Sequence, residues 1–380
     1  NGGGPMDTNS RLKVAIIGCG MIANTAHIPA YLNLGERVHL CAVSDLRADS
    51  ARETAERFSI PRWYTEAENM LIKEKPDIVS VCTSNASHKA MAMLAMRHGA
   101  HVACEKPVAL NYDDTRELYA YARKHGLVLF ACQVLRYNTE YQLAHEWAQE
   151  GRLGDIYFSE SVLIRRRGIP KWGAFHKKET NGGGVFCDLG VHLVDAALWV
   201  MGGPKFTSVS GVTSSVIARS GEEILTSVPE SGAPAGVPNM PPYSAKEFDV
   251  DEFAAGMIRL DNGASIHFKT SWAINLPNEY GMTFAGSLGG LVLPEMTLLT
   301  SMGRYQADVR PRVFSEERPY ANEVFPGHFF LMENAVDHLQ KGTPLMVQPE
   351  ETLNVTAIID GFYRSAELGR EVFADEIVGK

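Results

Sequence analysis

Three side chains have the chemistry needed to take a proton from a hydroxyl group. Lys106 stands in the run Glu105-Lys106-Pro107, and Asp188 and His192 are four residues apart in an apolar segment that follows three glycines. An imidazole, whose ordinary pKa is about 6.5, can accept a proton near neutral pH. An ammonium group can stabilise a developing alkoxide, and a carboxylate can orient the reacting molecule. These residue types therefore indicate acid–base chemistry on an alcohol.

The most direct division of roles makes His192 the general base. Lys106 would then hydrogen-bond the same oxygen, while Asp188 orients the substrate and lowers the cost of an imidazolium. A Lys106 with a lowered pKa is an alternative proton acceptor, and the sequence leaves this choice open. A lone histidine in an apolar helix is usually a core group, but residues four apart share one helical face. The Asp188–His192 pair beside Gly182-Gly183-Gly184 favours a functional role.

A dinucleotide fingerprint lies near the start of the chain. The run Gly18-Cys19-Gly20-Met21-Ile22-Ala23 follows an apolar segment and has the form G-x-G-x-x-A. The first glycine permits a tight turn, the second lets backbone approach a pyrophosphate, and the small alanine allows close helix packing. The helix N-terminus then receives the phosphates. We predict cofactor contacts at Gly18, Gly20, Met21 and Ile22.

Asp45 indicates which dinucleotide binds. It ends the next predicted strand, 25 residues after Gly20, near the usual place of the acid that binds the adenosine ribose hydroxyls. A carboxylate there repels a 2′-phosphate, so we predict NAD rather than NADP, although Arg47 partly opposes this preference. Thr83 and Asn85 follow the next strand and are further cofactor candidates, with a purely structural turn as an equally open reading.

The run Glu105-Lys106-Pro107 closes another predicted parallel strand. It therefore lies on the crevice side, where the nicotinamide should sit, and we predict cofactor contacts from Glu105 and Lys106. The alternative is a salt bridge between these two side chains. Pro107 is a candidate for a cis peptide bond, since such bonds occur at functional strand ends.

A basic and aromatic segment suggests the substrate. The run Arg165–Trp172 begins with three arginines, ends with a tryptophan and follows a predicted strand of the second domain. Guanidinium groups and an indole face suit a polyhydroxylated ring, and a solvated strand end is the alternative. Arg136 and Tyr157 are supporting candidates. The predicted substrate-binding set is Lys106, Arg136, Tyr157, Arg165, Trp172, Asp188 and His192.

The first part of the chain, residues 6–132, is predicted to form a Rossmann domain. Unbroken apolar runs alternate with amphipathic segments, which is typical of a doubly wound, parallel α/β sheet. The predicted strands are Lys13–Gly18, Val38–Ser44, Ile78–Thr83, His101–Cys104 and Val128–Cys132. The predicted helices are Ala48–Phe58, His88–His98 and Tyr112–His125, the last capped by Asn111.

Residues 133–380 are predicted to form an α+β domain with an open, mainly antiparallel sheet that binds the substrate. Its predicted strands are Ile156–Ile164, Thr207–Ala218, Phe253–Leu260, Ala264–Ser271 and Tyr280–Ala285, with a hairpin turn at Asp261-Asn262-Gly263. Helices are predicted over Thr139–Glu150, Phe329–Lys341 and Pro349–Gly369. The proline-rich stretch Val228–Pro242 is predicted to be a surface loop.

The composition excludes several other classes. A net charge of -9 argues against nucleic-acid or membrane-surface binding. No run of eighteen apolar residues and no leader pattern is present, so we expect a cytoplasmic protein. Six cysteines without a C-x-x-C pair indicate neither disulfides nor a metal site. Residues 1–5 precede Met6, the expected native start, and look like an expression remnant.

These motifs together resemble the Gfo/Idh/MocA oxidoreductases, which include glucose–fructose oxidoreductase and inositol dehydrogenase. The resemblance extends from Leu12 to Val372 and rests on the G-x-G-x-x-A turn, the Glu105-Lys106-Pro107 run and the D-x-x-x-H helix. It implies that Lys106, Asp188 and His192 are the catalytic residues. It also implies homo-oligomerisation through the sheet of the second domain.

The predicted function is oxidation of a secondary hydroxyl of a sugar, glycoside or polyol, with hydride transfer to NAD. A narrower hypothesis is oxidation of the C3 hydroxyl of a glucoside before deglycosylation by a partner enzyme. The alternatives are an NAD-dependent glycosidase that uses transient redox chemistry, a non-enzymatic nucleotide sensor, and a reductase for imines or biliverdin. The Arg165–Trp172 segment favours a polyol.

Overall fold

The chain folds into two compact units. The computed structural model describes residues 11–170, 173–220, 231, 244–312 and 324–379. One unit contains residues 11–137 together with 324–349, and the other contains residues 138–312 together with 350–379. The fold class predicted from the sequence, α/β with a parallel Rossmann sheet and a second, mainly antiparallel sheet, is confirmed.

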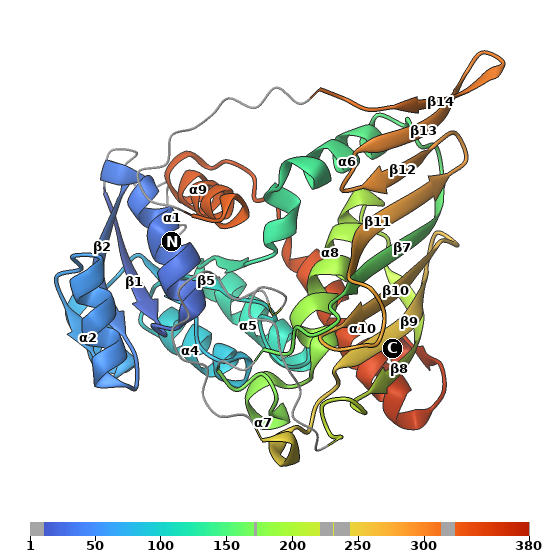
Figure 1. Ribbon diagram of the computed structural model, residues 1–380. Coiled ribbons are helices and arrows are strands. Elements are labelled where there is room, and N and C mark those ends of the chain that lie inside the picture. Colours follow the sequence, from blue (N-terminus) through green and yellow to red (C-terminus); the bar gives the residue numbers. More distant parts are fainter. Residues whose placement is uncertain (1–10, 171–172, 221–230, 232–243, 313–323, 380) are drawn as a thin grey trace. The chain divides into compact units, whose positions relative to one another are not determined.

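The first unit is built on a parallel sheet of six strands in the order β3-β2-β1-β4-β5-β6. Strands β1, β2 and β5 of this sheet are labelled in Figure 1. The strand order reverses between β1 and β4, which is the switch point where such sheets bind ligands. Strands β1, β2, β4 and β5 are almost wholly buried, as their apolar runs predict. The strands are β1 (Leu12–Ile17), β2 (Val38–Ser44), β3 (Trp63–Tyr64), β4 (Ile78–Val81), β5 (His101–Cys104) and β6 (Leu129–Ala131).

The helices of the first unit follow the predicted pattern, with one addition from far along the chain. Asn111 caps α5 by accepting from the backbone N of Asp114, at 2.8 Å. Helix α9 packs against α1, and its Phe329 and Met332 belong to the same core as β1. The predicted division placed this helix with the second domain. The helices are α1 (Ile28–Asn33), α2 (Ala48–Arg57), α3 (Ala67–Glu74), α4 (Asn85–Arg97), α5 (Tyr112–His125) and α9 (Pro326–Lys341).

The second unit is built on a nine-stranded sheet in the order β14-β13-β12-β11-β7-β10-β9-β8-β15 (Figure 1). Only the β7–β10 pair is parallel, and the turn Asp261-Asn262-Gly263 joins the antiparallel pair β9–β10 as predicted. The strands are β7 (Ile156–Ile164), β8 (Phe206–Ser214), β9 (Phe253–Leu260), β10 (Ser265–Ser271), β11 (Glu279–Gly286), β12 (Gly290–Leu293), β13 (Thr297–Met302), β14 (Tyr305–Val309) and β15 (Val372–Phe373).

Helices cover one face of this sheet (Figure 1). The ring of Phe186 stacks on Phe268 of β10 and contacts Phe362, so aromatic packing joins two helices to the sheet. The helices are α6 (Thr139–Gln149), α7 (Lys178–Asn181), α8 (Val191–Val200), α10 (Pro349–Leu368) and α11 (Asp375–Val378). The predicted strand Thr207–Ala218 ends earlier than expected, at Ser214. The predicted loop Val228–Pro242 lies outside the described residues, apart from Ser231.

The helical segment Lys178–Val200 has the length and the mean hydropathy, 1.4, of a membrane span. However, 89% of its apolar window is buried inside the structure. Burial against protein satisfies the same apolar side chains that a bilayer would. The segment therefore behaves as the core helix of the second unit.

Candidate active site

The G-x-G-x-x-A turn has the geometry expected of a phosphate-binding turn. Gly18 has φ +94°, and a Cβ there would lie 2.6 Å from the carbonyl oxygen of Cys82, so only glycine fits. A Cβ at Gly20 would have no atom within 4 Å. The Asn24 side chain, which the sequence analysis missed, donates to the carbonyls of Cys19 and Gly20. The first glycine thus serves the fold, and the second leaves room for a ligand.

The helix that follows this turn contains a π turn over Ala23–His27 and continues as α1. Ala23 is fully buried, as close helix packing requires. Met21 and Ile22, the predicted cofactor contacts at the helix start, are only partly buried. Short π turns inside α-helices are frequent at functional sites.

Asp45 lies directly after β2, beside the glycine turn. Its Oδ2 accepts from the backbone N of Cys19 at 2.9 Å, and its Oδ1 accepts from the backbone N of Arg47 at 2.9 Å. The carboxylate is 14% exposed, whereas the Arg47 side chain is 75% exposed. Asp45 is therefore fixed by backbone donors, and the sequence correctly placed it next to the turn.

The predicted cofactor residues lie at the carboxyl ends of four neighbouring strands. Asp45 follows β2, Gly18 follows β1, Thr83 follows β4 and Lys106 follows β5. Three strand spacings span about 14 Å, so these residues form a line along one edge of the sheet. Asn85 begins α4, where backbone N–H groups are directed toward this edge.

The Glu105-Lys106-Pro107 run is held from two sides. The Lys106–Pro107 peptide bond is cis, as predicted. His88 of α4 contacts the carbonyl oxygens of Pro107, at 2.7 Å, and Thr83, at 3.1 Å. Glu105 is 7% exposed and accepts from the backbone N of Lys106 at 3.2 Å. The loops after β4 and β5 are thereby tied together.

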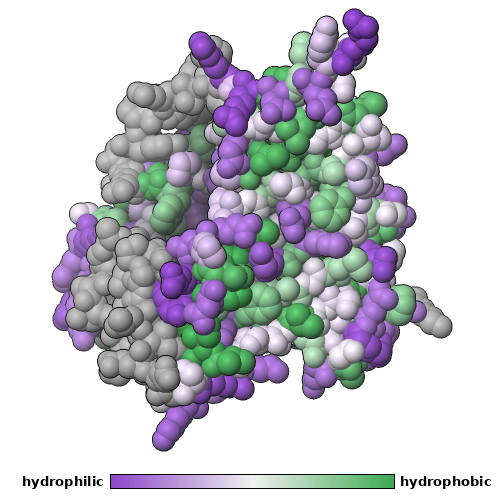
Figure 2. Space-filling view, turned by 45° about the vertical axis from the view of Figure 1, so that its right-hand side comes forward, coloured by the Kyte–Doolittle hydropathy of each residue, from purple (hydrophilic) through white to green (hydrophobic). Residues whose placement is uncertain are grey.

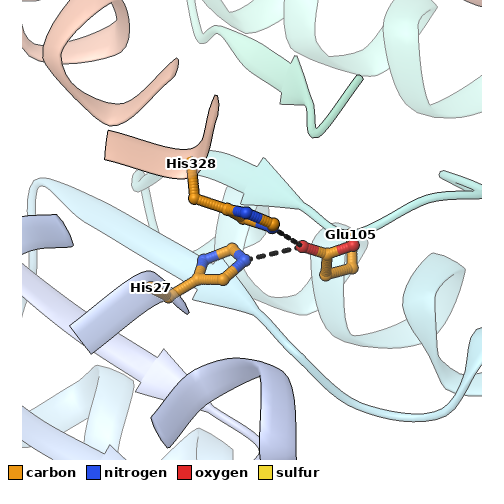
Figure 3. Close-up of side chains that lie close together, drawn as sticks. All are labelled: His27, Glu105 and His328. Carbon is orange, nitrogen blue, oxygen red and sulfur yellow. Dashed lines mark hydrogen bonds and ion pairs between the residues drawn. The ribbon is translucent and has the colours of Figure 1, made fainter. Parts of the chain in front are cut away.

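The carboxylate of Glu105 contacts two imidazoles, His27 and His328 (Figure 3). Burial alone would raise the pKa of Glu105, but the hydrogen bonds and charges of the two histidines outweigh burial and hold it well below its ordinary value. Burial lowers the pKa of His27, which favours the neutral ring, although Glu105 opposes this shift. Neither histidine was singled out from the sequence.

Asp188 and His192 lie in the second unit, on the helix that follows the triple glycine. This helix contains a π turn over Phe186–Gly190 and continues as α8. Of residues 185–200, all of them described, only Asp188 and His192 are not fully buried. The two polar side chains therefore share the accessible strip of an otherwise buried helix.

The second unit gives Asp188 two polar neighbours. The indole N–H of Trp272 donates to Asp188 Oδ2 at 3.0 Å, and Trp272 is fully buried. Burial lowers the pKa of Arg165, and the charge of Asp188 opposes that shift. Trp272 follows β10 and carries no motif, so its role was not visible in the sequence. The predicted residues Arg165 and Asp188 do belong to one polar group.

Arg165 also lines a pocket of about 390 Å³ at the end of β7 and the start of β11. Its guanidinium donates to the carbonyl of Ser231 at 3.0 Å. The hydroxyl groups of Tyr280 and the buried Tyr141 lie 2.5 Å apart. An arginine and an aromatic ring are suitable groups for a sugar ring. The pocket is lined by Leu163, Ile164, Arg165, Asn278, Glu279 and Tyr280.

The glycines before the helix that carries Asp188 and His192, Gly182–Gly184, have a different role from those of the nucleotide turn. The carboxylate of Asp251 accepts from the backbone N of Gly184 at 2.8 Å and of Phe186 at 3.2 Å. The Tyr363 hydroxyl accepts from Gly184 N at 3.1 Å and from Cys187 N at 3.2 Å. Protein groups thus cap the helix that carries Asp188 and His192.

The structure gives the surroundings of the two supporting substrate candidates, Arg136 and Tyr157. Arg136 is fully buried and donates to the carbonyl of Met346 at 3.3 Å, so its guanidinium holds a segment of the first unit. Tyr157 is 60% exposed at the start of β7, eight residues before Arg165. At about 3.3 Å per strand residue, the two backbones lie about 26 Å apart, too far for one sugar ring. Trp172 lies outside the described residues.

Comparison with known proteins identifies the family. Residues 12–133 match the model of an oxidoreductase family with an NAD-binding Rossmann fold, and residues 141–292 match the GFO/IDH/MocA C-terminal domain. The chain is 31% identical to D-glucoside 3-dehydrogenase of Escherichia coli strain K12 over 369 residues, 96% of this chain and 98% of that protein. The chain belongs to the Gfo/Idh/MocA oxidoreductase family.

Solved structures share the fold of this Gfo/Idh/MocA protein. Levoglucosan dehydrogenase, in complex with NADH and levoglucosan, has a TM-score of 0.79 at 20% identity, with 96% of this chain and all 100% of that chain covered. GenD2 from gentamicin A biosynthesis, in complex with NAD, has a TM-score of 0.74 at 24% identity, with 98% of each chain covered. The first unit is an NAD-binding domain of an oxidoreductase, and the open turn at Gly20 and the fixed carboxylate of Asp45 fit that cofactor.

Proposed function

We propose that this NAD-dependent oxidoreductase oxidises the C3 hydroxyl of a glucoside. The observation that carries the proposal is the match to D-glucoside 3-dehydrogenase along 96% of the chain, at 31% identity. The polar group formed by Asp188, Arg165 and Trp272 supports a polyhydroxylated substrate, because it offers both a carboxylate and a guanidinium to hydroxyl groups. The wider class, sugar and polyol dehydrogenases acting on CH–OH groups, is that of the family.

The proposed catalytic residues are Lys106, Asp188 and His192. His192 accepts the hydroxyl proton, and the Lys106 ammonium stabilises the oxygen as negative charge develops. Asp188, oriented by the Trp272 indole, positions a substrate hydroxyl and favours the imidazolium. NAD, which the Gly18–Ala23 turn and Asp45 would hold, would supply the hydride acceptor for the carbinol carbon. One C–H and one O–H bond break, and a C=O bond forms.

A ketone at C3 has a chemical consequence for the glycosidic bond. It acidifies the neighbouring C2–H, so that a base can remove this proton and expel the aglycone by elimination. The reaction that consumes the product is therefore an elimination catalysed by a separate lyase. The oxidation proposed here makes such a cleavage possible even for a C-glycosidic bond.

The proposed partner surface is the face of the nine-stranded sheet that the helices leave uncovered. Side-chain alternation along the paired strands places Phe158, Val212, Met257 and Val292 on this face, and Val212 is 61% exposed. Figure 2, with the right-hand side of Figure 1 turned forward, shows green and pale residues interspersed with purple ones. A second copy of this chain would bury these apolar side chains, as the resemblance implies.

The proposed location is the cytoplasm. All six cysteines are free and buried. Reduced thiols are the usual state in a reducing compartment.

The function is tested by measuring NADH absorbance with glucosides, free sugars, inositols and plant glycosides. Quinone or keto-sugar acceptors are added in parallel, in case the enzyme retains its cofactor. We expect NADH to accumulate with a glucoside and NMR to show a ketone at C3. Glycoside cleavage without net NADH would instead identify a redox-assisted glycosidase.

The catalytic assignment is tested by His192→Ala. Loss of the general base should lower kcat by about 10²–10⁴. Circular dichroism and NAD binding serve as controls for the fold. An unchanged kcat in a folded variant would remove His192 from the mechanism.

A further inference from the structure

Glu105 is a buried carboxylate held by groups from two distant parts of the sequence. Its Oε1 lies 2.8 Å from Nε2 of His27 and 3.2 Å from Nε2 of His328. Both imidazoles are directed at this one oxygen (Figure 3). A charge removed from water is strongly destabilising unless donors replace the lost hydration, and the two rings supply them. The other oxygen accepts from the backbone N of Lys106.

The hydrogen-bond roles around His27 form one continuous chain. Nδ1 of His27 lies 3.1 Å from Ser80 Oγ, and Ser80 Oγ lies 2.9 Å from the Tyr31 hydroxyl. If Tyr31 donates to Ser80 and Ser80 donates to Nδ1, a neutral His27 carries its proton on Nε2 and donates it to Glu105. Each polar group in this row of hydrogen bonds, from Tyr31 to Glu105, then has a partner.

The same three side chains have donor atoms within 4.8 Å of one another, close enough for a metal ion. A metal would take Nε2 of His27 and leave the proton on Nδ1, where it must donate to Ser80. Ser80 would then donate to Tyr31, and the fully buried Tyr31 hydroxyl would have no acceptor among the described residues. The hydrogen-bond network therefore accounts for the geometry better than a metal site does.

His328 is rigidly placed by the helix that carries it. It lies in the first turn of α9, next to Phe329, and that helix is anchored in the core of the first unit by Met332 and Val336. The chain segment 324–349 thus brings a single imidazole to the end of β5. This gives the returning segment a role beyond filling the core.

We propose that His27 and His328 are positioning residues for Lys106. They hold the Glu105 carboxylate in place, and Glu105 holds the backbone N–H of Lys106 at the end of β5. His88 fixes the following residue, Pro107, from the other side. The inference rests on the proposed function, in which Lys106 is catalytic.

The test compares three variants of the full-length enzyme. His328→Ala removes one of the two imidazole donors to Glu105. His328→Gln retains an N–H near the position of Nε2, and His101→Ala is the matched control. His101 is a buried histidine on the same strand, hydrogen-bonded to the backbone N of Val128, at the end remote from Glu105. We expect His328→Ala to lower kcat by about 10–100-fold with KM for NAD unchanged, since small misplacement of a catalytic group has effects of this size.

His328→Gln should recover most of the lost kcat, and His101→Ala should lower thermal stability but leave kcat unchanged. Equal losses of kcat in His328→Ala and His101→Ala would show a merely structural role and overturn the proposal. An effect limited to a higher KM for NAD, with kcat unchanged, would also overturn the proposal.

A second readout does not depend on the substrate. Lys106 is acetylated in NAD-free protein with a water-soluble reagent, and the modification rate is followed by mass spectrometry. Release of Lys106 should make this rate several-fold higher in His328→Ala than in wild type or His101→Ala, and unchanged rates would overturn the proposal. A wild-type enzyme inactive on every sugar would count against the proposed function alone. If wild type contained a stoichiometric metal ion and His328→Ala did not, the three side chains would form a metal site and the proposal would be wrong.

Discussion

The two units each place a glycine-rich loop before a helix that contains a π turn, yet the loops are used in opposite ways. At Gly20 of the first unit, a Cβ would meet no atom within 4 Å. At Gly184 of the second unit, a Cβ would lie 1.9 Å from the carbonyl oxygen of Asp251. One helix start is open to a ligand, and the other is filled by the protein itself.

The difference lies in where the acceptor for the helix N–H groups comes from. In the first unit Asp45 accepts from Cys19 in the glycine turn and from Arg47, and among the described residues no carboxylate accepts from the backbone N of Met21 or Ile22. In the second unit Asp251 takes the N–H groups of Gly184 and Phe186. Backbone N–H groups at a helix start bind whichever anion is supplied. Glycines therefore indicate that another group comes close to the backbone. The neighbouring side chains determine whether that group is a ligand or part of the protein.

The strongest test of this contrast is Gly184→Ala. The added methyl group would overlap the Asp251 backbone, so we expect a loss of about 3 kcal/mol or more in the free energy of unfolding. Chemical denaturation measures this loss. Gly20→Ala is the matched control and should unfold at nearly the wild-type denaturant concentration. Comparable destabilisation in both variants would contradict the contrast.

Removing the internal cap should have the next largest effect. Asp251→Ala leaves the N–H of Phe186 without its acceptor and the N–H of Gly184 with the Tyr363 hydroxyl alone, which costs about 1–3 kcal/mol. Asp249→Ala is the control, because this exposed carboxylate accepts from Lys178 N at the short helix α7. Its loss should cost less than about 1 kcal/mol. Thermal unfolding of both variants gives the comparison, and equal losses would mean that Asp251 does not act as a buried cap.

A substitution in the open loop at Gly20 should weaken NAD binding and leave the free energy of unfolding nearly unchanged. In Gly20→Ala the methyl group enters the space left for the pyrophosphate, so we expect the Kd for NAD to rise about tenfold, equivalent to about 1.4 kcal/mol. NAD titration followed by calorimetry measures this change. Gly18→Ala should instead destabilise the fold, because its Cβ would lie 2.6 Å from the Cys82 carbonyl oxygen. A Gly20→Ala variant with wild-type affinity would contradict the assignment.

The smallest expected effect concerns the choice of dinucleotide. Asp45→Asn removes the charge that repels a 2′-phosphate and leaves Arg47 nearby, so the ratio of kcat/KM for NAD to that for NADP should fall several-fold. Asp49→Asn, an exposed carboxylate on α2, is the control and should leave the ratio unchanged. A ratio unaffected by Asp45→Asn would exclude this residue as the discriminating group.

The sequence predicted those elements whose patterns are local. Strand β5 and helix α5 have the predicted bounds, because an unbroken apolar run and a capped amphipathic repeat identify themselves. The sequence did not reveal what the triple glycine contacts, since nothing near it in sequence shows that Asp251 fills the loop. Trp272 and His328 were missed for the same reason: each lies far from its partner in the chain. Arg136 is a further case, a charged residue whose burial no local pattern signals.

The return of residues 324–349 to the first unit means that the chain passes between the two units three times. Each unit is therefore assembled from two separate segments of the sequence. Cutting the gene at one boundary would also yield a nucleotide-binding fragment without the Met332 and Val336 part of its core. Neither half is therefore a natural module that can be expressed or exchanged alone, and a successful chimera must carry all three crossings.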